Sequence, residues 1–148
     1  MVERILVSPR PPGCFVWPVR VYYEDTDAGG VVYYANYLKF MERARTEWLR
    51  ALGFEQTALT QEDGVIFVVR KVSVEYRQPA VFNDPLEATA YPAEIGRTRI
   101  VFQQTVERDG AVLASGRVEV ACVNAVSFKP ARIPALLREN VVKNNDGI

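Results

Sequence analysis

The chain has 148 residues, 49% of them hydrophobic, which is enough to bury the core of one globular domain. Its 18 Lys and Arg residues balance its 18 Asp and Glu residues, so it lacks the basic field that attracts nucleic acid. It contains no histidine, which excludes Ser-His and Cys-His triads and most transition-metal sites. We expect no nucleic-acid partner and no metal, and any acid or base must be a carboxylate, Lys, Tyr or Cys.

Four of the nine prolines lie within the first 18 residues, where we expect a flexible or extended leader. The apolar stretch there is too short and too interrupted for a signal peptide, and no run of about 20 apolar residues follows to span a bilayer. Two cysteines, Cys14 and Cys122, support neither a disulfide framework nor a zinc site. We therefore expect a cytoplasmic protein with two free thiols that is not an integral membrane protein.

The first predicted strand covers residues 19–23, which are β-branched and aromatic, and it stops at a turn-rich stretch over 25–30. A long helix is predicted over 34–52, because apolar residues recur there at three- and four-residue steps, the period of one helix face. These apolar residues are Tyr34, Tyr37, Leu38, Met41, Ala44, Trp48, Leu49 and Leu52. Gly53 supplies the C-terminal stop.

The rest of the chain alternates with a period of two, which predicts strands. The predicted strands cover residues 68–76, 85–91, 98–107 and 111–123. The dipeptide Asp109-Gly110 between the last two is a hairpin signal. A short helix is expected after Pro134, with Leu136 and Leu137 packing back onto the domain.

This order of elements predicts an α+β domain in which an antiparallel five-stranded sheet wraps around one long central helix. We place the leader at 1–18, the domain at 19–137 and a C-terminal tail at 138–148. No internal repeat or second domain is visible in the sequence.

The loop between the first strand and the long helix carries the candidate chemistry. Asp27 precedes Gly29 and Gly30 and then a helix N-terminus, whose first amides lack intrahelical partners and favour negative charge. Glycines let a substrate carbonyl approach the backbone, so the loop offers a carboxylate for the carbonyl carbon and donors for its oxygen. Taken by its spacing alone, the loop is more typical of a turn with a capping aspartate.

Four segments carry a resemblance to a known family. They are residues 22–37 (YYEDTDAGGVVYYANY), 42–47 (ERARTE), 67–76 (FVVRKVSVEY) and 129–134 (KPARIP). Together they resemble the hot-dog-fold thioesterases of the 4-hydroxybenzoyl-CoA thioesterase family, in particular the Tol-Pal-associated acyl-CoA thioesterases. The resemblance covers roughly residues 19–137. Several matches in the right order are more specific than one loop and disfavour the turn-only interpretation of Asp27.

The resemblance implies a hot-dog fold and a role for each loop residue. Asp27 would be the nucleophile or the general base toward water, and Asp25 a supporting residue that orders the loop. The backbone amide of Tyr34 would hold the oxyanion, and Gly30 would line the carbonyl's approach. The Tol-Pal-associated branch usually carries histidine at the position of Tyr34, whereas the benzoyl-CoA branch tolerates tyrosine there.

The implied reaction is hydrolysis of an acyl-CoA to a free acid and CoA, with no cofactor apart from CoA as part of the substrate. An acyl-carrier-protein thioester is the alternative substrate. The expected substrate-binding residues are Val32, Tyr33, Arg70, Lys71 and Lys129, the last three as cations for phosphate. Hot-dog domains resemble one another in pairing their sheets edge to edge, so we expect a homodimer or a homotetramer.

Three other interpretations remain. A hot-dog hydratase or dehydratase is disfavoured, because that chemistry uses a histidine in the resembling families. A non-catalytic module that binds an acyl thioester or acyl-carrier protein, in phospholipid or envelope metabolism, is supported by the missing histidine. Finally, a related branch places its catalytic carboxylate on the central helix, where Glu42 and Glu47 lie, although neighbouring Arg43, Arg45 and Arg50 favour helix-surface ion pairs.

Overall fold

The computed structural model describes residues 10–145 of the chain. Its strands are β1 (Phe15–Arg20), β2 (Val65–Tyr76), β3 (Pro85–Ile95), β4 (Arg99–Arg108) and β5 (Ala111–Asn124). Its helices are α1 (Asn36–Ala51), the one-turn α2 (Gln56–Ala58) and α3 (Ala135–Asn144), with a short 3-10 turn at Tyr23–Asp25 and a π turn at Leu59–Asp63. The predicted α+β class is confirmed.

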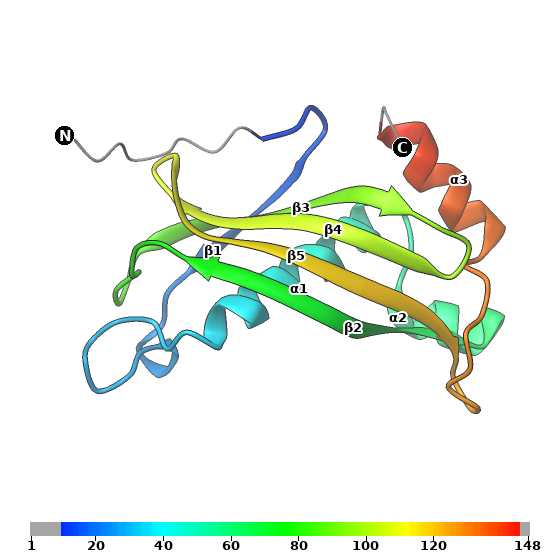
Figure 1. Cartoon of the computed structure of the whole chain (residues 1–148), viewed down its shortest axis with the longest axis horizontal. Helices are drawn as coiled ribbons and strands as arrows, with labels where there is room; N and C mark the ends of the chain where they lie inside the picture. Colours follow the sequence, from blue (N-terminus) through cyan, green and yellow to red (C-terminus); the bar gives the residue numbers. More distant parts are fainter. Residues whose placement is uncertain (1–9, 146–148) are drawn as a thin grey trace.

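The five strands form one sheet in the order β1-β3-β4-β5-β2, and every neighbouring pair is antiparallel. Helix α1 lies across one face of this sheet (Figure 1). It buries one long stripe of side chains in the core: Tyr37, Phe40, Met41, Ala44, Trp48 and Leu49. A sheet wrapped around one long helix is the expected hot-dog arrangement, so this prediction is confirmed.

The elements after α1 agree closely with the periodicity in the sequence. Strand β2 begins three residues before its predicted start and β3 ends four residues after its predicted end. Between β4 and β5, Asp109 and Gly110 both have positive φ, at 51° and 82°. That is the backbone of a two-residue hairpin turn whose twist matches the flanking strands, so the Asp-Gly prediction is confirmed.

The first strand differs from its prediction. Strand β1 covers Phe15–Arg20 rather than 19–23, and residues 23–25 form the 3-10 turn. It lies at the edge of the sheet and pairs with β3, and an edge strand tolerates Pro18 because one side of it needs no ladder hydrogen bonds. The boundary predicted after residue 18 therefore falls inside β1. Residues 1–9 of the predicted leader lie outside the described part of the chain.

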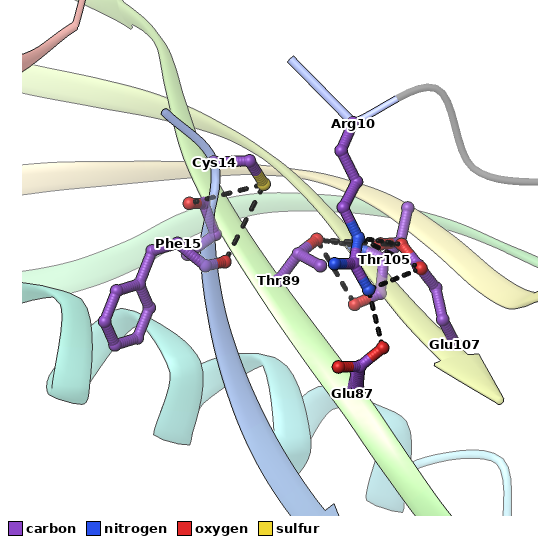
Figure 2. Close-up of polar contacts among 8 residues, drawn as sticks. Arg10, Cys14, Phe15, Glu87, Thr89, Thr105 and Glu107 are labelled. Carbon is purple, nitrogen blue, oxygen red and sulfur yellow. Dashed lines mark hydrogen bonds and ion pairs between the residues drawn. The ribbon is translucent and has the colours of Figure 1, made fainter. Parts of the chain in front are cut away.

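The segment before β1 is fastened to the sheet by an ion-pair network around Glu107 (Figure 2). Glu107 is only 1% exposed, and Arg10 donates to its Oε1 from Nη2 at 2.9 Å and from Nε at 3.2 Å. The same Nη2 lies 2.7 Å from Glu87. The Thr105 hydroxyl donates to Glu107 Oε2 at 2.5 Å, and Thr89 Oγ1 lies 2.7 Å from Thr105 Oγ1. Because a buried carboxylate is costly unless it is paired, Arg10 stabilises this part of the sheet.

The C-terminal helix extends past the predicted end of the domain. Helix α3 runs from Ala135 to Asn144, so the boundary predicted at residue 137 falls within it. Leu137 and Val141, four residues apart on one helix face, are fully buried in the core. Leu136 is exposed, so the expectation that it packs back was wrong.

Strand β2 forms the other edge of the sheet, and most of its side chains are exposed. Val68, Val69, Val72 and Tyr76 are among the exposed large hydrophobic residues of the described chain. A register shift against β5 between Val69 and Lys71 marks a β-bulge. A twelve-residue edge strand with exposed apolar side chains is a surface that readily pairs with another strand.

Candidate active site

The loop between β1 and α1 is ordered by Asp25, which is buried. Its Oδ2 accepts a hydrogen bond from the Tyr22 amide at 2.8 Å. Its main-chain carbonyl accepts from the Tyr33 amide at 3.0 Å and from Nδ2 of Asn36, the first residue of α1, at 2.9 Å. Asp25 therefore ties both ends of the loop to the start of the helix.

Asp27 lies at the exposed tip of this loop. Its Oδ1 accepts a hydrogen bond from the Gly29 amide at 2.8 Å, while its main chain bonds Val31 and Gly30 at 2.9 and 3.0 Å. These bonds hold the residue in one conformation. Within residues 10–145, Asp27 Oδ2 has no hydrogen-bond or ion-pair partner. One carboxylate oxygen is thus held in place and the other is available.

The start of α1 differs from the predicted helix in a way that matters for the amides. The helix begins at Asn36 rather than at residue 34, and its first amides are paired. The amides of Asn36, Tyr37 and Leu38 donate to carbonyls three residues earlier, at 2.8, 3.4 and 3.1 Å. The expectation of a free first turn was therefore wrong for these three. The Tyr34 amide just before them has no hydrogen-bond partner among the described residues, so it remains an open donor.

The two glycines of the loop have different structural roles. Gly30 has φ +81°, and no heavy atom lies within 4 Å of the place where a Cβ would sit. It is required for the left-handed turn and leaves open space beside the loop. At Gly29 a Cβ would lie 3.2 Å from Asp27 Oδ1, so this glycine makes room for the carboxylate itself.

Tyrosine rings surround the start of the helix. The ring centroids of Tyr33 and Tyr34 lie 4.9 Å apart, and the Tyr34 ring lies 6.0 Å from that of Tyr76 on β2. The neighbouring Tyr34 hydroxyl raises the pKa of Tyr33, and the negative charge of Asp27 acts in the same direction. Tyr33 is therefore a neutral phenol at physiological pH and no general base.

The structure does not bring the predicted substrate-binding residues together. Val32 is buried and its amide donates to the Ala80 carbonyl, and its assignment to the substrate site stays a prediction. Arg70 and Lys71 lie midway along β2, and Arg70 pairs with Glu119 at 3.7 Å. Lys129 lies in the β5–α3 connection, which Figure 1 shows at the opposite end of the sheet from the Asp27 loop. Of these predicted substrate-binding residues, only Tyr33 belongs to the loop surface near Asp27 within one chain.

The other candidate groups have structural explanations. Glu47 pairs with Arg50 at 2.7 Å on the surface of α1, as the ion-pair interpretation predicts. For Arg45 that interpretation was wrong, because its Nη1 donates instead to the neutral Gln104 Oε1 at 2.8 Å. Cys122 is fully buried, and burial raises its thiol pKa to about 11, which makes it unreactive as a nucleophile.

Fold and loop together define the class of protein as a hot-dog thioesterase domain. The chain is similar to a solved structure described as a probable thioesterase from Bartonella henselae, with a TM-score of 0.79 and 35% sequence identity. That likeness covers 82% of this chain and 99% of the other.

Sequence relatives identify the family more narrowly. Residues 29–115 match the family model described as Thioesterase superfamily. Acyl-CoA thioester hydrolase YbgC of Escherichia coli is 50% identical over 121 residues, which cover 81% of this chain and 90% of that protein. Acyl-CoA thioesterase YbgC of Haemophilus influenzae is 46% identical over 120 residues, with 81% and 88% covered. The chain belongs to the thioesterase superfamily, as the resemblance predicts.

Sequence reasoning did not single out the pair formed by Arg45 and Gln104. Gln104 is 2% exposed, and its Nε2 donates to the main-chain carbonyls of Met41 and Thr89, both at 2.9 Å. A signal was present, since Arg45 lies four residues from both Met41 and Leu49 on the buried side of the helix.

In the described part of the chain, no helix is long and apolar enough to cross a membrane.

Proposed function

We propose that this chain hydrolyses acyl-CoA thioesters to a free acid and CoA at the loop before α1. One observation carries the proposal: on the same loop, Asp27 presents an unpaired carboxylate oxygen while the Tyr34 amide has no partner among the described residues. The names of the relatives, acyl-CoA thioesterase and acyl-CoA thioester hydrolase, support the substrate class.

The chemistry follows from these two groups. As a nucleophile, Asp27 adds to the thioester carbon, the C–S bond breaks, CoA leaves as a thiolate that water protonates, and water cleaves the mixed anhydride. As a general base, Asp27 takes a proton from the water that adds to that carbon; the C–S bond then breaks, and CoA leaves as a thiolate that takes the proton from Asp27. By either route the carbonyl oxygen becomes negative, and the Tyr34 amide donates a hydrogen bond to it.

The test is thiol release from short-chain, long-chain and aromatic acyl-CoAs by the wild type and Asp27→Asn. We expect kcat/KM to fall about 10²- to 10⁴-fold in the variant. Asp109→Asn is the matched control, because Asp109 is an exposed turn aspartate at a left-handed position that asparagine also adopts. Full turnover in Asp27→Asn would remove Asp27 from the mechanism.

The two roles of Asp27 are separated by trapping. Borohydride added during turnover reduces an aspartyl anhydride to homoserine, which peptide mass spectrometry detects at residue 27. Homoserine supports the nucleophilic route. Its absence, when rapid quenching also finds no acyl-enzyme, supports the general base.

A non-catalytic binding module is the second candidate, and the side chain of Tyr34 favours it. This tyrosine stands where the resembling branch usually has histidine, and its ring packs against Tyr33 and Tyr76. Binding of acyl-CoA or an acyl-carrier-protein thioester without thiol release from any of them identifies a module. Thiol release that depends on Asp27 identifies an enzyme.

We further propose a homodimer, or a tetramer of two dimers, joined through the exposed edge of β2. In such a dimer the two β2 strands run antiparallel, so each end of β2 lies beside the opposite end of the other copy's β2. The β5–α3 connection, which carries Lys129, then approaches the Asp27 loop of the other copy. Arg70 and Lys71 lie between this connection and that loop. Light scattering should give the mass of two or four chains, and Val72→Lys on the edge should lower it. A monomeric wild type contradicts the proposal.

A cytoplasmic location and the absence of a cofactor stay predictions.

A further inference from the structure

A cavity of about 280 Å³ lies between the C-terminal half of α1 and the sheet, and it is separate from the Asp27 loop. Its lining combines polar side chains with an apolar wall formed by Trp48, Leu49, Phe67, Ile100, Phe102 and Val120. The rings of Trp48 and Phe102 meet edge to face there, with centroids 5.0 Å apart. Arg45 also lines it, eleven residues after Tyr34, or about 16 Å along the helix axis at 1.5 Å per residue.

The guanidinium of Arg45 is the unusual feature of this cavity. Its Nη1 donates to Gln104 Oε1 at 2.8 Å, and no carboxylate of residues 10–145 lies within ion-pair distance of it. The amide of Gln104 is itself oriented, because its Nε2 donates to two main-chain carbonyls. Burial lowers the pKa of Arg45, although the charge of Glu42 acts in the opposite direction. A positioned, partly buried cation thus lines the cavity beside its aromatic wall, and the hydrogen-bond partner of this cation is neutral.

We propose that this cavity binds a monocarboxylic acid of about ten non-hydrogen atoms, with the carboxylate on Arg45 and the hydrocarbon against the aromatic wall. The size follows from the volume, since a cavity of about 150 Å³ holds benzene and this one is nearly twice as large. The head group follows from charge, since the planar guanidinium fork matches a carboxylate and a buried cation is stabilised by a counter-charge.

Glu42 sets a limit on the anion's affinity. It also lines the cavity, one helical turn before Arg45, and its exposed carboxylate repels a bound acid. Glu42→Gln should therefore strengthen acid binding, which a ligand of any other charge would not show. The acid released by the proposed hydrolysis belongs to the ligand class, and only this link rests on the proposed function.

The test compares octanoate, which has ten non-hydrogen atoms, with octanol by calorimetric titration of the full chain. Binding is also followed by the fluorescence of Trp48, which lines the cavity, in a Trp17→Phe variant that leaves Trp48 as the sole tryptophan. We expect octanoate to bind about tenfold or more tighter than octanol. Arg45→Met should abolish this preference while octanol still binds, which shows an intact cavity. Arg43→Met, an exposed change on the same helix, should leave both affinities within about twofold.

The inference is overturned if octanoate binds no tighter than octanol, if Arg45→Met keeps the preference, or if Glu42→Gln weakens octanoate. Octanoate binding to a wild type that hydrolyses no thioester leaves the inference standing and removes the proposed function. Octanoate that binds Asp27→Asn as tightly as the wild type shows that the cavity and the Asp27 loop are separate sites. Thiol release from acyl-CoA by a wild type that binds no octanoate overturns the inference and leaves the proposed function standing.

Discussion

Replacing Gly29 by alanine should lower turnover while leaving stability unchanged. A Cβ at residue 29 would lie 3.2 Å from Asp27 Oδ1, closer than ordinary van der Waals contact, so the carboxylate must move by a few tenths of an ångström. That movement weakens the 2.8 Å hydrogen bond from the Gly29 amide. Gly29 is exposed and its φ lies outside the left-handed region, so alanine itself introduces no backbone strain.

The expected loss is about tenfold in kcat/KM. A displacement of about 1 Å at a reacting group costs about 100-fold in rate, and this displacement is smaller. A hydrogen bond to a charged group contributes about 1.5–3 kcal/mol, and partial loss of about 1.4 kcal/mol corresponds to tenfold. The free energy of unfolding should change by less than about 0.5 kcal/mol.

The assay is thiol release from an acyl-CoA that the wild type hydrolyses, together with urea unfolding of each variant. Gly96→Ala is the control, because a Cβ there meets Arg99 only at ordinary contact distance, 3.5 Å. Gly30→Ala provides the contrast, with about 1 kcal/mol of lost stability from its φ of +81°. Unchanged kcat/KM in Gly29→Ala would refute the idea that the loop holds Asp27 in a reactive position. A loss of kcat/KM that is matched by a proportional loss of stability in Gly29→Ala would also refute it.

Two further predictions concern groups away from the loop. Arg10→Met should lower the free energy of unfolding in urea by about 2 kcal/mol, because it leaves the buried Glu107 without its cation. Adding Glu107→Gln should recover at least half of that loss, and no recovery would contradict this explanation. At pH 8.5 about 0.3% of Cys122 is thiolate, given its pKa of about 11, so iodoacetamide should label it only after unfolding. The pKa of the Cys122 thiol is higher in the folded than in the unfolded chain, so the free energy of unfolding should fall as pH rises from about 9 toward 11. This fall should be smaller in Cys122→Val, and an equal dependence on pH in the two proteins would refute the prediction.

Local patterns in the sequence were sufficient wherever the physical cause is local. The three- and four-residue spacing of apolar residues located α1 to within two residues, because a helix is built from bonds between near neighbours. Asp109-Gly110 located a hairpin, because both residues adopt positive φ readily. The loop around Asp27 and its glycines was recognised for the same reason, as a short run of turn residues before a helix.

The candidate site was predictable only in part, because its open groups are defined by what other segments leave unpaired. Within residues 10–145 the Tyr34 amide has no partner, whereas the amides of Asn36, Tyr37 and Leu38 are paired in the tight first turn of α1. Val32 was expected at the substrate, yet its amide pairs with Ala80, far along the chain, and its side chain is buried. Periodicity carries no information about such partners.

The sequence by itself determined the class of fold, the central helix, the hairpin and the loop that holds Asp27. Only the tertiary structure decided that Phe15–Arg20 is an edge strand, that β2 is left exposed, and that Arg45 donates to Gln104 beside a cavity with an aromatic wall. The physical reason is the range of the interactions involved. Secondary structure depends on neighbours a few residues away, whereas burial, strand order and charge pairing depend on segments that meet only when the sheet closes around the helix.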